Sequence, residues 1–369
     1  AVELQYASAY ARLANYWKYF MGQTEQLKNL HVFEKKQGEE DAFRQWADEN
    51  DHDLSDLMTE YQKAYAAYSP YARHATYYTE AFMAPALTRM GAACEAAEKA
   101  LKQGLAEDSL QGICKRLMQT RRSLLNDISV PLDKKVFAAL NQLYYEDIPK
   151  SQHPSFFNEM FEQYGSEHLE TTFAHVAEDM YTQTVLLDSD KFNAWCTPEH
   201  LSDLLKDPAV RYALAGVHNY KDHYEANVNN FTYTLMDLNR DYQGALMRMH
   251  PEKQMYPDAN STMRATYGRV CAYQPKDAVA FNYYTTADGL LEKYQPESRE
   301  FNLPAHVVDL IKKHDFGDYE DATQHNLMTC FITNNDITGG NSGSPVMNGE
   351  GELIGCAFDG NWEAMSGDV

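Results

Sequence analysis

The spacing of apolar residues changes once along the 369-residue chain, near residue 255. Before that point, apolar side chains recur every three or four positions, which is typical of amphipathic helices. The longest such run extends from Tyr224 to Met249 and predicts one long helix of an antiparallel bundle. After that point, short runs rich in Thr, Tyr, Val and Phe indicate β-strands. We therefore expect an α+β chain, with a large helical domain over residues 1–255 and a β-rich domain over residues 256–369.

Capping residues and prolines mark several helix starts in the first part of the chain. A short polar side chain before a helix accepts hydrogen bonds from the first N–H groups, and proline fits the first helical turn. These signals predict helices that start at Asp108 or Ser109, at Pro131, at Thr197-Pro198 and at Asp207-Pro208. In the helix after Pro131, the spacing predicts that Phe137 and Leu143 face inward.

The second part of the chain contains several strand signals and one helical one. Residues 264–273, 278–286 and 330–333 are expected to form strands, and residues 305–313 a helix. Another strand is expected to start at Pro345, turn at Asn348-Gly349 and return over residues 352–358.

Composition narrows the classes of partner. The formal net charge is −22, from 32 basic and 54 acidic residues, which argues against nucleic acid because phosphates would be repelled. No apolar run approaches the roughly 20 residues that a membrane span needs. The six cysteines form no CxxC pair, and His168 and His175 are two helical turns, or ~10 Å, apart. We therefore expect no metal and no cofactor.

A glycine-rich loop from Thr338 to Pro345 carries the strongest chemical signal. Ser342 follows two glycines and precedes a third, so the backbone can turn sharply and leave N–H groups unpaired. A serine nucleophile needs such donors, because they stabilise the oxyanion of the tetrahedral intermediate. We expect the N–H groups of Gly340 and Ser342 to form this oxyanion hole. The alternative interpretation is an ordinary Gly/Ser turn.

A serine nucleophile also needs a general base, usually a histidine oriented by an acid. The histidines before residue 255 lie in helical sequence, His306 lies in an expected helix, and His314 and His325 lie in polar loops. None stands in a setting typical of a catalytic histidine. Either the base lies outside this sequence, or the serine is unassisted, or one of these histidines serves.

The order of serine loop, strand, turn and strand resembles the nucleophile region of chymotrypsin-like proteases, although Asn341 and Ser344 depart from their Gly-Asp-Ser-Gly-Gly-Pro pattern. Together with residues 358–363, the loop resembles the bacterial serine dipeptidyl-peptidases of the type 7 and type 11 group, and type 7 most closely. Residues 264–268, 282–286 and 15–18 extend this resemblance. It implies a chymotrypsin-like β-barrel fold with an inserted helical domain. This chain would contain that domain and part of the second barrel, with the catalytic His and Asp elsewhere.

The resemblance also assigns roles to five residues. Ser342 matches the nucleophile, and Gly340 matches the other oxyanion donor. Asn15 and Asp359 match positions that hold the N-terminal amine of the substrate. Gly360 matches the floor of the pocket for P1, the residue before the cleaved bond. An arginine there would select acidic side chains, whereas glycine leaves the pocket open for apolar ones.

The resemblance implies a serine exopeptidase that releases dipeptides from peptide N-termini, with an apolar P1 preference. This chain alone is expected to be inactive, because its His and Asp would be missing. The whole enzyme is expected to be a homodimer in the periplasm or at the cell surface of a Gram-negative bacterium. The alternative is a helical binding or scaffold module that carries a vestigial protease-like tail.

Overall fold

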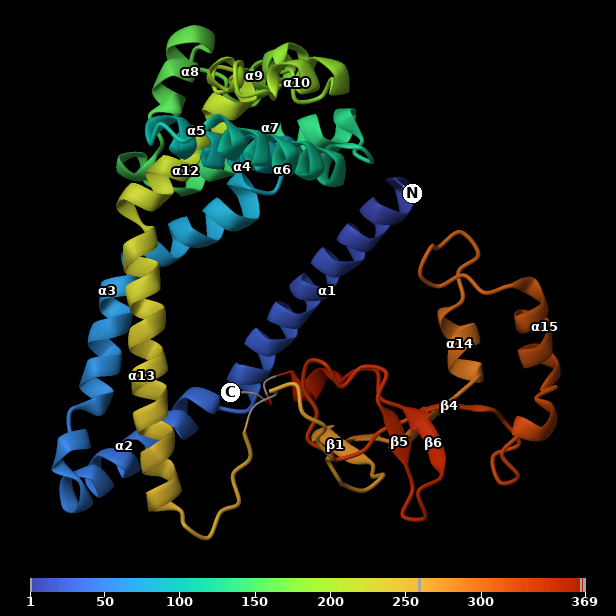
Figure 1. Ribbon diagram of the computed structural model, residues 1–369. Helices are drawn as coiled ribbons and strands as arrows, with labels where there is room; N and C mark the ends of the chain where they lie inside the picture. Colours follow the sequence, from blue (N-terminus) through green and yellow to red (C-terminus); the bar gives the residue numbers. More distant parts are fainter. Residues whose placement is uncertain (1, 258–259, 366, 368–369) are drawn as a thin grey trace. The chain divides into compact units, whose positions relative to one another are not determined.

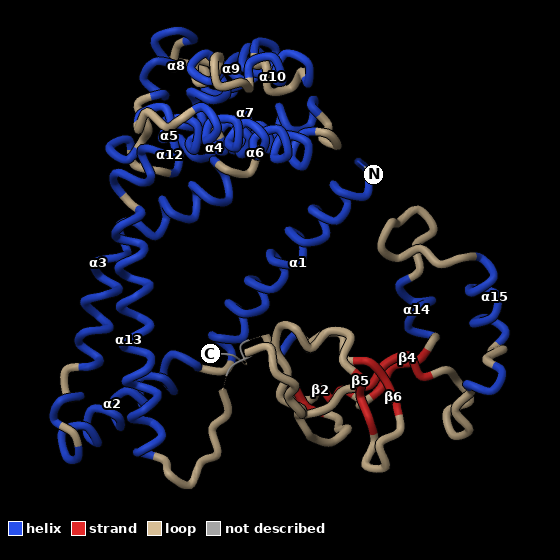
Figure 2. Tube along the Cα trace, viewed as in Figure 1, coloured by secondary structure: helices blue, strands red, loops and turns tan. Residues whose placement is uncertain are grey.

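The computed structural model describes residues 2–257, 260–365 and 367. They form two compact units, one of residues up to 13 with residues 37–255, the other of residues 14–36 with residues from 256 onward. Helix α1 (Val2–Asn29) contributes to both. Helices and antiparallel strand pairs occur in one chain, so the α+β prediction is confirmed (Figure 2). The assignment of residues 1–255 to a single domain stays a prediction.

Helices make up most of the first unit. After α1 the described helices are α2 (Val32–Asn50), α3 (Leu57–Tyr77), α4 (Ala86–Ala93), α5 (Glu95–Lys102), α6 (Glu107–Leu125), α7 (Val130–Asp147), α8 (Phe156–Tyr164), α9 (Leu169–Gln183), α10 (Ser189–Trp195), α11 (Leu201–Leu204), α12 (Pro208–His223) and α13 (Glu225–Met249). A π-helical turn, Tyr78–Phe82, continues α3. The long helix expected over residues 224–249 is therefore confirmed, and it lies beside α3 (Figure 1).

Two separate cores hold the first unit together. The larger core lies among α4 to α12 and buries large aromatic side chains, such as Phe137, Phe157 and Tyr212. The smaller core contains Phe43 and Leu238, where α2, α3 and α13 meet. Burial of apolar area is the main stabilising contribution in both cores.

Buried carboxylates satisfy two helix N-termini. Asp207 caps α12 as predicted, accepting hydrogen bonds from the N–H groups of Ala209 and Val210 at 2.9 and 3.3 Å. Asp133 on α7 does the same for α4, accepting from Ala86 N at 2.8 Å across 47 positions of sequence. Such a distant cap leaves no local signal in the sequence.

Three expected features of the helices are wrong in detail. Helix α6 starts at Glu107 without a side-chain cap, so Asp108 and Ser109 lie in its first turn. Thr197-Pro198 leads into a turn, and α11 starts only at Leu201. Leu143 is 43% exposed, because the buried face of α7 is completed by Asn141 and Tyr144 instead.

The described residues of the second unit form three antiparallel strand pairs. They are β1 (Tyr273–Lys276) with β2 (Val279–Phe281), β3 (Tyr284–Thr286) with β4 (Met328–Phe331), and β5 (Pro345–Met347) with β6 (Leu353–Cys356). The helices of this part are α14 (Asp288–Lys293) and α15 (Ala305–Lys313), and α15 confirms the predicted helix. Strand pairing is shorter than expected: residues 264–269 are loop, and residues 278–286 divide into β2 and β3.

A fully buried histidine lies in the larger core. The Nε2 atom of His74 is 2.6 Å from the hydroxyl of Tyr144, and its ring stacks on Tyr224 with centroids 3.8 Å apart. Its Nδ1 atom has no partner among the described residues. Burial, and secondarily the nearby His153, lowers the pKa of His74 to about 4. The imidazole is therefore neutral in the folded protein at pH 7.

We predict that His74 makes the fold sensitive to acid. Because the pKa of His74 is lower in the folded than in the unfolded state, acid protonates the unfolded chain first. The contribution of neutral His74 to the free energy of unfolding is therefore complete above pH 6.5 and is lost as the pH falls toward 4. The loss amounts to about 3 kcal/mol in the free energy of unfolding. His74→Phe should be less stable at neutral pH but should lose less stability between these values. Urea unfolding at a series of pH values measures this slope.

Exposed His52 provides the control, since His52→Phe should leave the slope unchanged. An equal slope in wild type and His74→Phe would contradict the prediction.

Candidate active site

The serine loop is closed by hydrogen bonds within residues 338–344. Asn341 N donates to the carbonyl of Thr338 at 3.2 Å, and the side chain of Asn341 accepts from Thr338 N at 3.0 Å. Ser344 N donates to the carbonyl of Asn341 at 2.9 Å. Gly340 has a φ angle of +97°, which side chains disfavour, so this turn requires glycine there.

A β-ladder continues the β5–β6 hairpin into this loop. Gly343 N donates to the carbonyl of Ala357 at 2.7 Å, and Ala357 N donates to that of Ser344 at 2.9 Å. Ser342 therefore lies one residue beyond the ladder, and it is exposed. The hairpin predicted from Pro345 onward is present, and its return strand ends at Cys356 rather than 358.

The turn of this hairpin differs from the expected two-residue turn at Asn348-Gly349. Its loop spans residues 348–352, and the left-handed glycine is Gly351, with a φ angle of +82°. The side chain of Asn348 accepts from the N–H groups of Glu350 and Glu352 at 3.1 and 2.9 Å. These bonds favour the longer loop.

The hydroxyl of Ser342 points to the strand that returns from the hairpin. Its Oγ atom donates a hydrogen bond to the carbonyl of Phe358 at 3.2 Å. The N–H groups of Gly340 and Ser342 donate to no acceptor within residues 2–257, 260–365 and 367. An exposed hydroxyl and two available backbone donors thus lie in one loop, the arrangement that acyl transfer requires.

The residues after Phe358 form an exposed segment next to this hydroxyl. Gly360 N donates to the carboxylate of Asp359 at 2.8 Å, and both residues are exposed. Among the described residues, a Cβ atom at Gly360 would meet only the Cβ of Ala364, at the ordinary distance of 3.8 Å. A Cβ is therefore sterically tolerated at position 360.

Asn15 lies on α1, in the part of that helix that belongs to the second unit. Its side chain is exposed. Seven residues further on, Gly22 packs against Trp362 and Met365, at the short 3₁₀ helix Trp362–Ala364. Seven residues are about two turns and ~10.5 Å, so Asn15 and Gly22 share one face of α1.

Ser342 Oγ forms no hydrogen bond with a described histidine of the second unit. His314 pairs with Asp288 at 3.7 Å, and His325 pairs with Glu320 at 3.2 Å. In the described part of the chain, Ser342 Oγ donates its hydrogen bond to the carbonyl of Phe358. This geometry gives no support to the interpretation in which this chain contains its own base.

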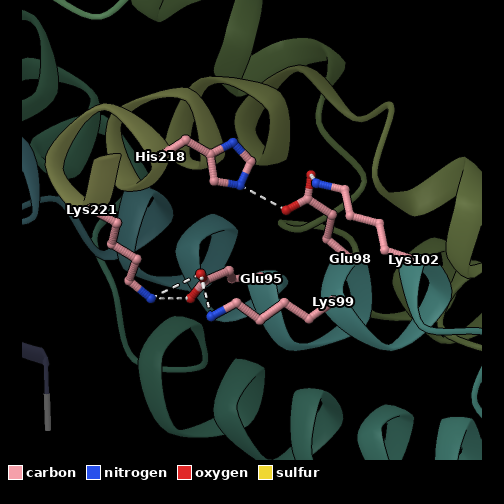
Figure 3. Close-up of polar contacts among 6 residues, drawn as sticks. All are labelled: Glu95, Glu98, Lys99, Lys102, His218 and Lys221. Carbon is pink, nitrogen blue, oxygen red and sulfur yellow. Dashed lines mark hydrogen bonds and ion pairs between the residues drawn. The ribbon is translucent and has the colours of Figure 1, made fainter. Parts of the chain in front are cut away.

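A dense group of charged side chains in the first unit was not predicted from sequence. It contains Glu95, Glu98, Lys99 and Lys102 of α5 with His218 and Lys221 of α12 (Figure 3). Lys221 contacts Glu95 at 2.6 Å, and His218 contacts Glu98 at 2.7 Å. Burial raises the pKa of each carboxylate, but the hydrogen bonds that it accepts hold it below its ordinary value.

These contacts join α5 to α12, and Glu98 and His218 line one side of a cleft of about 630 Å³. Each carboxylate already has two basic partners, Lys99 and Lys221 for Glu95 and Lys102 and His218 for Glu98, so we interpret the group as structural. Among the described residues, no group of three or more His, Cys, Asp or Glu side chains could hold a metal ion. No described helix is long and apolar enough to cross a membrane.

Comparison with known proteins finds one peptidase family and relatives named as dipeptidyl-peptidases. The peptidase S46 family profile matches residues 1–369. Dipeptidyl-peptidase 7 of Porphyromonas gingivalis is 34% identical over 376 residues, covering 100% of this chain and 50% of that protein. An Asp/Glu-specific dipeptidyl-peptidase of Flavobacterium psychrophilum is 32% identical over 378 residues, covering 100% of this chain and 51% of that protein.

A solved structure shares the fold. The crystal structure of Porphyromonas endodontalis DPP11 in complex with the dipeptide Arg-Glu matches 100% of this chain and 52% of its own, with a TM-score of 0.83 and 26% identity. The chain thus spans about half the length of the curated relatives it matches.

Proposed function

This chain belongs to the peptidase S46 family, as its resemblance to the serine dipeptidyl-peptidases predicted, and we propose that the whole protein releases dipeptides from peptide N-termini. The observation that carries this proposal is the 3.2 Å hydrogen bond from Ser342 Oγ to Phe358 O. It brings an exposed hydroxyl, two available backbone donors and the segment 358–360 to one place. Both named relatives are dipeptidyl-peptidases, which supports the same reaction.

In the proposed mechanism, Ser342 Oγ attacks the carbonyl carbon of the second residue of the peptide, and the amine of the third residue leaves. A histidine, oriented by an aspartate in the rest of the whole protein, takes the hydroxyl proton and passes it to the leaving amine. The N–H groups of Gly340 and Ser342 stabilise the oxyanion, because they donate to no described acceptor. Water then hydrolyses the dipeptidyl ester on Ser342, which releases the dipeptide.

A dipeptidyl-peptidase must measure two residues from a charged amine. We assign this task to Asn15 and Asp359, whose oxygen atoms accept hydrogen bonds from an ammonium group. Asp359 directly follows the carbonyl that Ser342 contacts, and Asn15 lies on the face of α1 that packs beside Trp362. A buried ammonium without such acceptors would bind poorly, so N-terminally blocked peptides should be rejected.

Position 360 supports an apolar P1 preference. Overall similarity does not decide this point, since relatives named for Asp/Glu specificity are almost as similar as type 7 relatives. Glycine at position 360 adds neither charge nor bulk, and the space beside it is open. An apolar P1 side chain needs no partner at this uncharged position, whereas a carboxylate would find no cation there to pair with.

Assembly and location follow from the resemblance alone. We propose a homodimer in the periplasm or at the cell surface of a Gram-negative bacterium, acting on peptides with a free N-terminus. The competing function, a helical binding or scaffold module with a vestigial protease-like tail, predicts no turnover by the whole protein.

We predict that residues 1–369 alone lack peptidase activity, whereas the whole protein is active. A serine without its base loses on the order of 10⁴-fold or more in rate. The assay uses a chromogenic dipeptidyl substrate with Leu or Phe at P1, and Ser342→Ala in the whole protein is the blank. Ser344→Ala, two positions away in the same loop, should retain activity. Turnover by residues 1–369 comparable to that of the whole protein, lost in Ser342→Ala, would contradict the assignment of the base.

We also predict that Gly360→Arg shifts the preferred P1 residue from apolar toward Asp or Glu. The guanidinium would pair with a substrate carboxylate and fill the space that an apolar side chain uses. The ratio of kcat/KM values for Glu and Phe substrates should rise by tens- to hundredsfold. Gly349→Arg is the control, because it adds the same charge to an exposed turn of the same hairpin. A folded, active Gly360→Arg enzyme with an unchanged order of preference would remove position 360 from the pocket.

A further inference from the structure

Gly22 is a glycine in the interior of a long helix, at the point where α1 meets the segment after Gly360. A Cβ atom there would lie 3.0 Å from Cγ of Met365 and 3.1 and 3.2 Å from two ring carbons of Trp362. Glycine in a helix interior destabilises the helix relative to alanine, so its presence calls for a packing reason. The close approach of Trp362 and Met365 supplies that reason.

The 3₁₀ helix Trp362–Ala364 is also held by a side chain at the start of β1. The hydroxyl of Tyr273, at the start of β1, donates to the carboxylate of Glu363 at 2.5 Å. Asn361 Nδ2 donates to the same oxygen at 3.5 Å. Trp362 therefore cannot move freely away from α1, because its neighbour Glu363 is bonded to a strand.

Two contacts thus connect α1 with the serine through a short stretch of backbone. At one end, Ser342 Oγ donates to the carbonyl of Phe358. At the other end, four residues later, Trp362 lies against Gly22. Asn15 shares the face of α1 that carries Gly22, about two turns away. Any change in the spacing between α1 and Trp362 would therefore move Asn15 relative to Ser342.

We propose that Gly22 is a positioning residue, which sets the spacing between α1 and residues 358–362. This spacing in turn sets the length of the N-terminal fragment that the site releases. The proposal rests on the proposed function, because Asn15 and Ser342 are taken as the two ends of the dipeptide site. Gly22 itself touches no substrate. A side chain at position 22 displaces α1, and the ammonium group then loses its alignment while the serine loop is unchanged.

The test compares substitutions at two helical glycines in the whole protein. Gly22→Ala and Gly22→Leu are the variants, and Gly38→Ala and Gly38→Leu are the controls. A Cβ at Gly38, on α2, meets no atom of the described residues within 4 Å. Because small displacements from productive geometry are costly, we expect Gly22→Leu to raise KM for a free-amine dipeptidyl substrate on the order of tenfold or more, with a smaller change in kcat.

Length selectivity separates positioning from general damage. Gly22→Leu should release relatively more single residues or tripeptides from matched peptides than the wild type does. Adding Met365→Ala to Gly22→Ala removes the atom that the new methyl group meets first. The double variant should therefore have a lower KM than Gly22→Ala and should recover part of the length selectivity. If Gly22→Leu matches Gly38→Leu in KM and in product length, the proposal is overturned.

Hydrogen exchange tests the packing role of Gly22 independently of enzyme activity. Hydrogen exchange of a peptide covering residues 358–365 should be faster in Gly22→Leu than in Gly38→Leu, because Trp362 loses its support. Equal exchange overturns the packing role of Gly22 even if the enzyme is active. Absence of dipeptide release by the wild-type whole protein would instead overturn the proposed function, and exchange would still decide the packing role.

Discussion

The hydrogen-bonded pairing of Gly343 and Ser344 with Ala357 determines where the candidate site lies. It extends the β5–β6 hairpin by two residues and ends directly before Ser342. These two backbone hydrogen bonds hold the turn that carries the serine against the end of the hairpin, although the serine itself is exposed. The same pairing places Phe358 opposite Ser342, so the hydroxyl and the segment that follows are fixed together.

The site thus combines rigid and adjustable parts. The turn at Gly340 and the pairing with Ala357 fix Ser342, the proposed nucleophile, and the backbone N–H groups proposed as its oxyanion donors. The packing of α1 on Trp362 fixes the other end, where the amine would bind. A Cβ at position 360 meets the described residues only at ordinary van der Waals distance, which suits the substrate-distinguishing role proposed for this position.

Sequence patterns predicted the elements that are specified locally. Asp207-Pro208 predicted the start of α12, and the apolar spacing predicted α13 and α15, because each signal lies within the element itself. The serine loop and its hairpin were found for the same reason. The role given to Ser342 came from the loop pattern and from family resemblance, those given to Asn15 and Gly360 came from resemblance alone, and all three stay predictions.

Features that depend on distant contacts were missed. Asp133 caps a helix 47 positions away, and the packing of Gly22 on Trp362 joins residues 340 positions apart. Residues 264–269 have strand-like composition, but only Val270 and its neighbours reach a pairing partner. A glycine inside a strong helical pattern was the one available signal for the contact at Gly22.

Covalent capture of the nucleophile tests the proposed chemistry most directly. The whole protein would be treated with a phosphonate ester of a dipeptide that carries a free amine and an apolar P1 residue, and the adduct would be located by peptide mass spectrometry. We expect one adduct, on Ser342, which forms in parallel with loss of activity and is prevented by the corresponding dipeptide. Loss of activity with the adduct on another residue would contradict the assignment of Ser342 as the nucleophile.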